Sequence, residues 1–149
     1  MNVEDILTVD RIVCGREVTS KKKALETTAE LLGSAETTVP AHAIADGLFA
    51  RERLGSTGLG DGVALPHTRT SDVARATGAF LRVHPPVDFD APDDKPVDLL
   101  FGLMVPEEST DEHLQILARL AEIFSDAGLR NRLRKSGDPA EVLGILCTA

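Results

Sequence analysis

The sequence predicts an α/β protein in which one β-sheet is covered by helices on both faces. Segments with helical and with strand periodicity are mixed along the chain, and the connections between them are long enough for parallel strands to pair. Residues 97–105 form the most apolar run, which is typical of a central strand buried on both sides. These two observations define the fold class.

The N-terminal third of the chain predicts a short helix, a small strand and a longer helix. Residues 3–12 have apolar side chains in positions that suit one or two helical turns, and residues 14–18 could form a small strand. Thr19 or Ser20 then caps a helix that ends at Gly33.

The next segment predicts a helix, a glycine-rich turn and a short strand. Residues 40–54 suit a helix with Pro40 in its first position and Gly55 as its C-terminal cap. Residues 55–62 hold four glycines in eight positions and are typical of a loop or tight hairpin. A short apolar strand at residues 63–65 follows, and Pro66 ends it.

Two longer strands and one short edge strand are expected in the middle of the chain. Residues 76–83 alternate as a strand does. Residues 84–95 contain three prolines and should be mostly irregular, with one short edge strand near residues 87–89. The central strand, residues 97–105, comes next and Pro106 ends it.

Three helices are expected after the central strand. Ser109 and Glu112 have the spacing of a capping box, so the first helix should begin there. Shorter helices should cover residues 128–136 and 138–147. The predicted core stripe of the first helix consists of apolar residues at helical spacing: Leu114, Leu117, Leu120, Ala121, Phe124.

Composition excludes several classes of protein. The chain has 149 residues and a formal net charge of −8, with no Trp, no Tyr and five Phe. Acidic chains repel a phosphate backbone and few rings are available to stack on bases, so nucleic acid is not an expected partner. The N-terminus lacks the features of a signal peptide, and no apolar run approaches the roughly 20 residues of a bilayer span. A cytoplasmic protein without stable membrane insertion is expected.

The basic and sulfur-containing residues have ordinary interpretations. Cys14 and Cys147 are expected to be reduced thiols, with a single disulfide left open and Arg16 as the nearest cation to Cys14. The lysines at 21–23 should form a solvated face, with a surface for an acidic partner as the alternative. A solvated helix is also expected for the C-terminal basic residues Arg130, Arg132, Arg134, Lys135.

The segment that carries chemistry runs from residue 53 to 67. Its glycines follow a predicted helix and precede a strand, whereas the glycines of a dinucleotide-binding motif follow a strand and open a helix. The Gly-Lys-Ser/Thr of a P-loop is also missing, so the segment does not favour nucleotide binding. His67 follows the apolar strand and Pro66, and reactive groups in open α/β sheets lie at strand ends. From position alone, a structural histidine is as good an interpretation as a reactive one.

His67 has no partners at metal-ligand spacing, so neither a metal nor a cofactor is expected. A neutral imidazole can accept a phosphoryl group, provided that donors and a cation meet the phosphate oxygens. The nearby side chains offer such groups, and His113 could add a second imidazole. The candidates for holding phosphate are Arg53, Ser56, Thr57, Gly58, Gly60, Arg69.

These residues resemble the enzyme IIA family of the bacterial phosphoenolpyruvate-dependent phosphotransferase system, of the fructose/mannitol type. The resemblance covers nearly the whole chain and is greatest for the free-standing, nitrogen-regulatory branch. The matching segments are residues 20–25, 51–53, 55–60, 62–67, 97–101 and 105–106, and the helix that begins at His113-Leu114.

The resemblance implies one domain over residues 1–149, with a mixed sheet of roughly five strands between helices. It implies that His67 is the phosphoacceptor, that Arg53 stabilises the phosphate and that His113 is the second active-site histidine. Two departures stand out. Thr68 replaces a smaller residue and could narrow access or add a donor, and Asp61 should point away from the phosphate.

The resemblance also implies partners. An HPr-type carrier, itself supplied by an enzyme I from phosphoenolpyruvate, would donate the phosphoryl group. Three outputs remain open: regulation of targets such as kinases or potassium transporters, transfer to a IIB domain of a sugar permease, and a binding module without phosphoryl transfer. His42 and His84 join no matching motif and are expected to be surface histidines.

Overall fold

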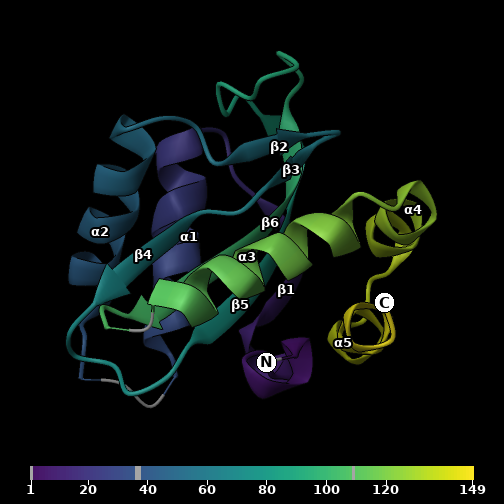
Figure 1. The fold of residues 1–149 in the computed structure, drawn as a ribbon. Coiled ribbons are helices and arrows are strands. Elements are labelled where there is room, and N and C mark those ends of the chain that lie inside the picture. Colours follow the sequence, from purple (N-terminus) through teal and green to yellow (C-terminus); the bar gives the residue numbers. More distant parts are fainter. Residues whose placement is uncertain (1, 36–37, 109) are drawn as a thin grey trace.

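The computed structural model describes residues 2–35, 38–108 and 110–149, and it shows the predicted α/β layers (Figure 1). Its strands belong to one sheet of six strands, one more than the rough expectation. The strands are β1 Ile12–Glu17, β2 Gly58–Gly60, β3 Val63–Ala64, β4 His67–Thr70, β5 Thr77–Val87 and β6 Val97–Pro106.

The sheet is mixed, as expected, and β6 is its central strand. The strand order is β1-β5-β6-β3-β2, and β4 pairs with β6 beyond the end of β3. β5 is antiparallel to β6, whereas β3 and β4 run parallel to it. β4 was not expected as a strand, because its residues His67–Thr70 are polar and continue the line of β3 only after Pro66.

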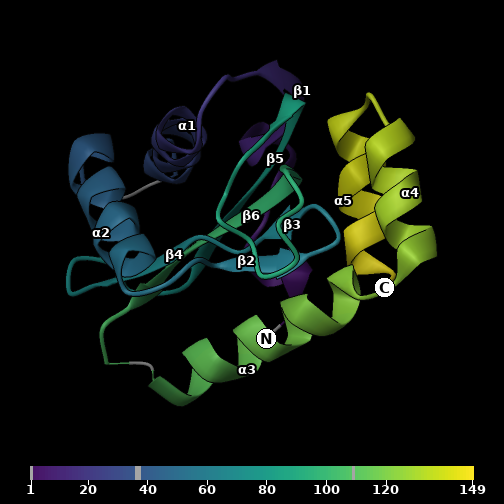
Figure 2. The ribbon, with the colours of Figure 1, turned by 90° about the horizontal axis from the view of Figure 1, so that it is seen from above.

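Helices cover both faces of the sheet, as Figure 2 shows from above. α1 and α2 lie on one face, and α3, α4 and α5 lie on the other. The helices are α1 Lys21–Gly33, α2 Ala41–Arg53, α3 Thr110–Phe124, α4 Ala127–Lys135 and α5 Pro139–Cys147.

The apolar side chains of β6 fill both layers of the core. Phe101 and Leu103 belong to the cluster under α3, α4 and α5, whereas Leu100 and Met104 belong to the cluster under α1 and α2. Successive side chains of a strand point to opposite faces, so burial on both faces requires the continuous apolar run seen in the sequence. Gly102 lets α1 approach the strand, because a Cβ there would clash with Cγ2 of Thr28.

The glycine-rich segment is the tight hairpin that its composition favours. β2 and β3 are antiparallel, and the turn between them contains Asp61 at φ 57° and Gly62 at φ 80°. A turn with positive φ at both central positions suits Asp-Gly and matches the twist of a hairpin. Ser20 caps α1 through a hydrogen bond from the Lys23 amide.

Some element boundaries differ from the sequence prediction. Residues 3–12 do not form an α-helix but two short 3₁₀ helices, η1 Val3–Asp5 and η2 Val9–Arg11. Pro40 is the N-cap of α2, with extended backbone, instead of its first helical residue. β5 continues through the cis His84–Pro85 bond to Val87, so residues 87–89 form no separate edge strand.

The predicted core stripe of α3 is partly wrong. Leu114 is 59% exposed, whereas His113 is only 4% exposed and Ile116, Leu120 and Phe124 are buried. The buried face begins at 113 and continues at 116, 120 and 123, which is the spacing of a helix that packs on a sheet. The one-residue rotation turns His113 inward. Ser109 of the expected capping box lies outside the described residues.

The C-terminal basic residues are less solvated than expected. Arg134 forms an ion pair with Asp98, with 2.9 Å between Nε and Oδ2, and donates to the Asp61 carbonyl at 2.6 Å. Arg130 donates to the Phe124 carbonyl at 2.9 Å. α4 thereby ties the β2–β3 turn to β6, and Arg132 and Lys135 remain exposed.

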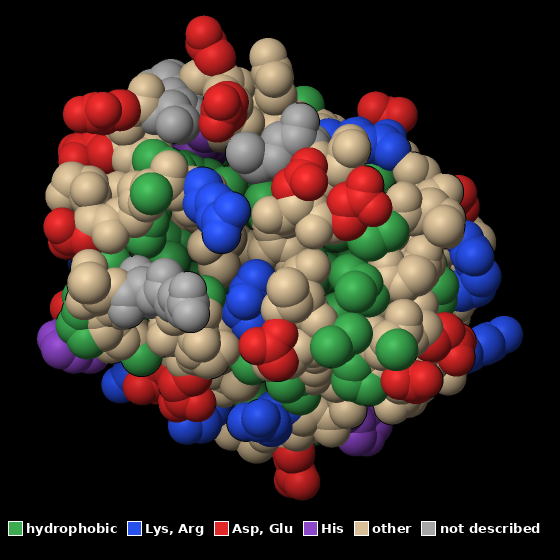
Figure 3. Space-filling model, turned by 90° about the horizontal axis from the view of Figure 1, so that it is seen from below, with side chains coloured by type: hydrophobic (Ala, Val, Ile, Leu, Met, Phe, Trp, Pro, Cys, Tyr) green, Lys and Arg blue, Asp and Glu red, His purple; other side chains and the backbone are tan. Residues whose placement is uncertain are grey.

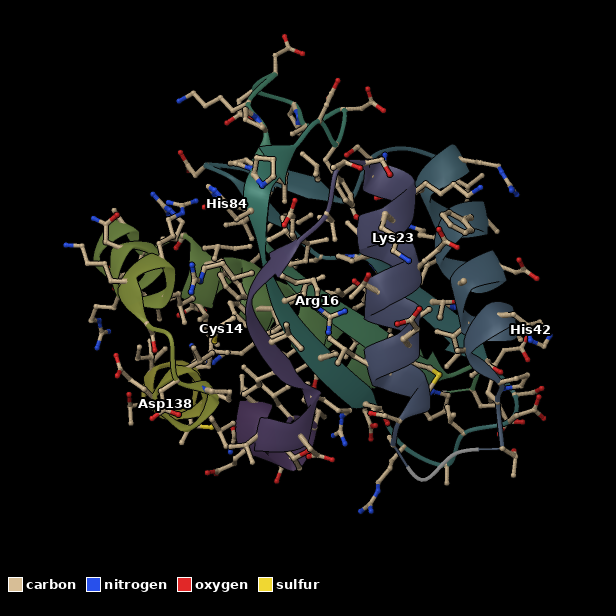
Figure 4. All side chains as sticks on the ribbon, turned by 180° about the vertical axis from the view of Figure 1, so that it is seen from behind. Cys14, Arg16, Lys23, His42, His84 and Asp138 are labelled. Carbon is tan, nitrogen blue, oxygen red and sulfur yellow. The ribbon has the colours of Figure 1, made fainter. Side chains whose placement is uncertain are left out.

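No helix within the described residues is long and apolar enough to cross a bilayer. Both cysteines are free thiols, and burial raises the pKa of each. The cation that acts on the pKa of Cys14 is Arg82, not Arg16, and Figure 4 shows Cys14 and Arg16 on opposite sides of β1.

Candidate active site

Two histidines from distant parts of the sequence meet at one end of the sheet. His67 is the first residue of β4, and His113 lies in the first turns of α3. Their ring centroids are 5.2 Å apart, with the planes at 81°. His67 is half-buried and His113 is buried. The structure therefore brings together the two imidazoles that the sequence analysis singled out.

A backbone carbonyl fixes the orientation and the tautomer of His67. Nδ1 of His67 lies 2.8 Å from the carbonyl oxygen of Leu65. A carbonyl oxygen only accepts, so Nδ1 carries the proton and the lone pair is on Nε2. Pro66 sits between the two residues and restricts the backbone that holds this geometry.

Both imidazoles are kept neutral at physiological pH. Burial is the largest cause that lowers the pKa of His67, and the charges of Arg51 and Arg69 add to it against the opposing Leu65 hydrogen bond. Burial also lowers the pKa of His113 to about 4, with further contributions from His67, Arg69 and Arg51. A neutral imidazole is the nucleophilic form.

A hollow of about 330 Å³ opens beside His67. The end of α2 contributes Arg51, the glycine-rich loop contributes Ser56 and Gly58, and α3 contributes Leu117 and Ala121. A larger hollow, of about 960 Å³, shares no lining residue with this one. It lies between the N-terminal 3₁₀ turns and the loop after β4, and Figure 3 shows that face with basic side chains near its middle.

Arg51, not Arg53, is the arginine beside His67. Arg51 donates from Nη1 to the Gly55 carbonyl at 2.8 Å and lines the hollow with His67. Arg53 is exposed and lines a separate hollow with Lys22 and Phe49. Residues two apart on a helix face different directions, which accounts for the different positions of the two arginines. The structure therefore places Arg51, and not the predicted Arg53, in the hollow with His67.

The glycine-rich loop is held by internal hydrogen bonds that the sequence analysis missed. Glu52, at the end of α2, accepts from the backbone N–H of Thr57 at 2.9 and 3.0 Å and from its hydroxyl at 2.5 Å. Ser56 donates to the Phe89 carbonyl at 2.7 Å and accepts from the Gly58 amide at 3.0 Å. The hydroxyls of Ser56 and Thr57 and the amides of Thr57 and Gly58 are therefore already engaged, and these residues shape the hollow.

The remaining predicted phosphate ligands divide. Gly60 pairs with Val63 in the hairpin, and a Cβ there would meet Asp93, so it lies outside the hollow that contains His67. Arg69 does reach the histidine pair, because its Nε donates to Nδ1 of His113 at 3.3 Å. Arg69 follows His67 by two residues on β4, so strand alternation places both side chains on the same face.

The two departures from the family pattern leave the site clear. Thr68 points to the opposite face of β4, where its hydroxyl lies against Gly47 of α2. It therefore does not narrow access to His67. Asp61 is exposed and lies 3.9 Å from Arg130, pointing away from the histidines as expected.

The other titratable residues of interest lie elsewhere. His42 and His84 are exposed, as expected, and Figure 4 shows them on α2 and β5, far from each other.

Lys21 is not part of a simple solvated face, because it lies 3.8 Å from Glu52 and 4.6 Å from the centre of the Phe89 ring. Among the described residues, no cluster of three or more His, Cys, Asp and Glu side chains could hold a metal ion.

Comparisons with known proteins show which family the chain is similar to. Residues 5–148 match the family described as "Phosphoenolpyruvate-dependent sugar phosphotransferase system, EIIA 2". A nitrogen regulatory protein of Pseudomonas aeruginosa is 45% identical over 143 residues, covering 96% of this chain and 92% of the relative. A fructose-specific EIIA component of Haloferax volcanii is 34% identical, covering 98% and 97%.

Solved structures give the same result. The nitrogen regulatory protein IIA-Ntr of Neisseria meningitidis superimposes with a TM-score of 0.92 and 48% identity, covering 97% of this chain and 98% of that chain. IIA mannitol of Escherichia coli gives 0.80 and 25%, covering 94% and 98%. The chain belongs to the EIIA type-2 family of the phosphoenolpyruvate-dependent sugar phosphotransferase system.

Proposed function

We propose that this protein is a phosphoryl carrier that accepts a phosphoryl group on Nε2 of His67 from an HPr-type carrier and acts as a phosphorylation-dependent regulator. The observation that carries the proposal is the Leu65 carbonyl 2.8 Å from Nδ1 of His67. It leaves the Nε2 lone pair as the nucleophile, beside a second neutral imidazole and two arginines. The family, whose members are phosphotransfer components, supports the reaction class.

The transfer step balances without any added reactant. Nε2 of His67 attacks the phosphorus of the carrier's phosphohistidine, whose other ring nitrogen is protonated. The N–P bond to the carrier breaks as the new N–P bond forms, and its electron pair returns to the carrier ring, which leaves as a neutral imidazole. His67 keeps its Nδ1 proton, and the Leu65 carbonyl accepts from the cationic phosphoimidazolium that results.

Charge stabilisation comes from the residues around the hollow. Phosphoryl transfer depends mainly on positioning and on cations that meet the equatorial oxygens. Arg51 supplies the guanidinium that lines the hollow, and His113 supplies a neutral ring at 5.2 Å from His67. Both states are phosphohistidines, so we expect transfer to be reversible and close to thermoneutral.

The regulatory output follows from the charge change. The transferred phosphoryl group carries nearly two negative charges on its oxygens while the His67 ring becomes cationic, so loading adds a net charge of about −1. This charge lies within reach of a protein docked at the hollow, because screening acts over about 8–10 Å. The similarity to nitrogen regulatory proteins supports a regulatory output. We propose that its targets are proteins, such as kinases or potassium transporters. The phosphoryl group comes from phosphoenolpyruvate through enzyme I and the HPr-type carrier, so we propose that the protein acts in the cytoplasm.

A second candidate output is sugar transport. The 34% identity to a fructose-specific EIIA component supports transfer from His67 to a IIB domain. The two outputs use the same phosphorylated histidine, so they differ only in the protein that receives the signal or the phosphoryl group. Mixing the phosphorylated protein with a IIB domain of the same organism separates them, because only a transport component loses its phosphoryl group at a rate comparable to its loading.

The test of the carrier function is intact-mass spectrometry. The protein is incubated with phosphoenolpyruvate, enzyme I and an HPr-type carrier, and wild type is compared with His67→Ala. We expect one acid-labile phosphoryl adduct on wild type and none on the variant. An adduct that persists in His67→Ala would overturn the assignment of His67. No adduct on wild type with the organism's own carrier would favour a binding module without phosphoryl transfer.

A further inference from the structure

Among the described residues, Arg69 makes the only hydrogen bond to a ring nitrogen of His113. Its Nε donates to Nδ1 of His113 at 3.3 Å. β4 carries both His67 and Arg69, and residues two apart on a strand share a face. The strand therefore presents one imidazole and one guanidinium to the same buried histidine of α3.

This contact determines where the proton of His113 resides. A guanidinium has five N–H donors and no acceptor, and it keeps its charge at any physiological pH. Nδ1 of His113 must therefore accept, and it carries no proton. His113 is neutral at physiological pH because its pKa lies near 4. Its single proton is then on Nε2.

We propose that Arg69 is a positioning residue that holds His113 as the Nε2–H tautomer, so that His113 donates a hydrogen bond to the phosphoryl group on His67. This inference rests on the proposed phosphoryl transfer and goes beyond it. It replaces the expectation that Arg69 binds phosphate directly. Within the described residues, no protein group accepts a hydrogen bond from Nε2 of His113, so that proton is available to a phosphate oxygen.

The two histidines are thus held in complementary forms by different partners. Leu65 holds the proton of His67 on Nδ1 and leaves a lone pair on Nε2. Arg69 occupies the lone pair of His113 on Nδ1 and leaves a proton on Nε2. One ring offers electrons to phosphorus while the other offers a donor to its oxygens. Reversal of either tautomer would place two lone pairs or two donors at the reacting group.

The experiment is a long-range ¹H–¹⁵N NMR spectrum of the unphosphorylated protein at neutral pH, because protonated and unprotonated imidazole nitrogens have distinct ¹⁵N shifts. Wild type is compared with Arg69→Met, which removes the donor, and Arg69→Lys, which restores a donor without an acceptor. Arg75→Met is the matched control, since it removes an exposed charge from the loop after β4. His67 is an internal control in every spectrum.

We expect wild type, Arg69→Lys and Arg75→Met to show His113 protonated on Nε2 alone. Arg69→Met should show a mixture of both His113 tautomers while His67 stays protonated on Nδ1. The loading rate of Arg69→Met should fall by about tenfold, the effect of one lost hydrogen bond of modest strength. The proposal is overturned if wild-type His113 is protonated on Nδ1, or if Arg69→Met leaves its tautomer unchanged.

Failure of this inference can be told apart from failure of the proposed function. The tautomers are measured on protein that has never met a phosphoryl donor. If wild type takes up no phosphoryl group, the proposed function fails even though the spectra still decide the tautomer. If wild type is loaded and the tautomer does not respond to Arg69, only the positioning role of Arg69 is lost.

Discussion

At the scale of single residues, the site depends on which side chains reach His67. The hollow contains Arg51, and the hydrogen bond of Arg51 to Gly55 anchors its guanidinium there. Arg53 lies on another side of the same helix and faces solvent. The two arginines have the same chemistry and lie two residues apart, so they form a matched pair for testing the geometry.

Arg51→Ala should slow phosphoryl loading of His67 by about 100-fold, which is the usual cost of removing one preorganised charge-stabilising group. Arg53→Ala should load at the wild-type rate. Both loading rates can be measured by quenching the reaction with the phosphorylated carrier at short times and recording the intact mass of the protein by mass spectrometry. Equal slowing in both variants would contradict the placement of the two side chains.

The two histidines also make stability depend on pH. Their folded-state pKa values lie below the ordinary 6.5, and that of His113 lies near 4. Between these values the unfolded chain therefore binds more protons than the folded protein. The contribution of the two histidines to the free energy of unfolding is complete above about pH 6.5 and is lost as the pH falls toward 4. Urea unfolding midpoints of wild type should drop over this window.

His113→Asn is the control for this pH dependence. Asn has no titrating group, so the variant should lose less stability than wild type between pH 6.5 and pH 4. Carboxylates titrate alike in both proteins and cancel in the difference. Parallel curves for the two proteins would show that burial does not shift the titration of His113.

At the scale of elements, the glycine-rich loop is shaped by the end of α2. The Glu52 side chain is 6% exposed, and its carboxylate accepts from both the amide and the hydroxyl of Thr57. Lys21 of α1 lies 3.8 Å from the same carboxylate. One carboxylate thus joins two helices to the loop that forms the wall of the hollow.

Glu52→Gln should destabilise the protein by about 1–3 kcal/mol, because an amide replaces a charged acceptor of buried hydrogen bonds. Loading of His67 should slow as well, since the loop loses its anchor. Urea unfolding gives the stability and intact mass gives the rate. Glu26→Gln, on the partly buried side of α1, is the comparison variant and should change neither. If Glu52→Gln matched it, the carboxylate would not hold the loop.

At the scale of the whole molecule, the sheet joins two cores and places the site at the edge where β4, α2 and α3 meet. α1 packs on one face of β6 at Gly102, and α3 packs on the other face through Leu120 and Phe124. The close approach of α1 at Gly102 leaves no room for a methyl group. α2 makes its own contact with the sheet at β4, where Gly47 lies against Thr68.

Gly102→Ala should therefore destabilise the protein by about 1–3 kcal/mol through overpacking against Thr28. Gly144→Ala in α5 is the matched control: open space surrounds that position, and alanine favours a helix by about 1 kcal/mol. Thermal or urea unfolding of the three proteins checks both signs. A neutral Gly102→Ala would mean that α1 can move away from β6 without cost.

The sequence by itself determined the fold class, the central strand, the hairpin and the identity of the two histidines. These features depend on local patterns: the apolar run of β6, the Asp61-Gly62 turn, and the sequence around Pro66 and His67. A family resemblance over nearly the whole chain added the roles that spacing alone left open.

Only the tertiary structure decided which groups surround His67. The choice between Arg51 and Arg53 depends on the rotation of α2 about its axis, and the burial of His113 instead of Leu114 depends on the rotation of α3. A rotation of one residue, about 100°, changes the side chain that faces the sheet while leaving the periodic pattern almost the same. The contact between Arg69 and His113 joins residues 44 apart, so packing alone creates it.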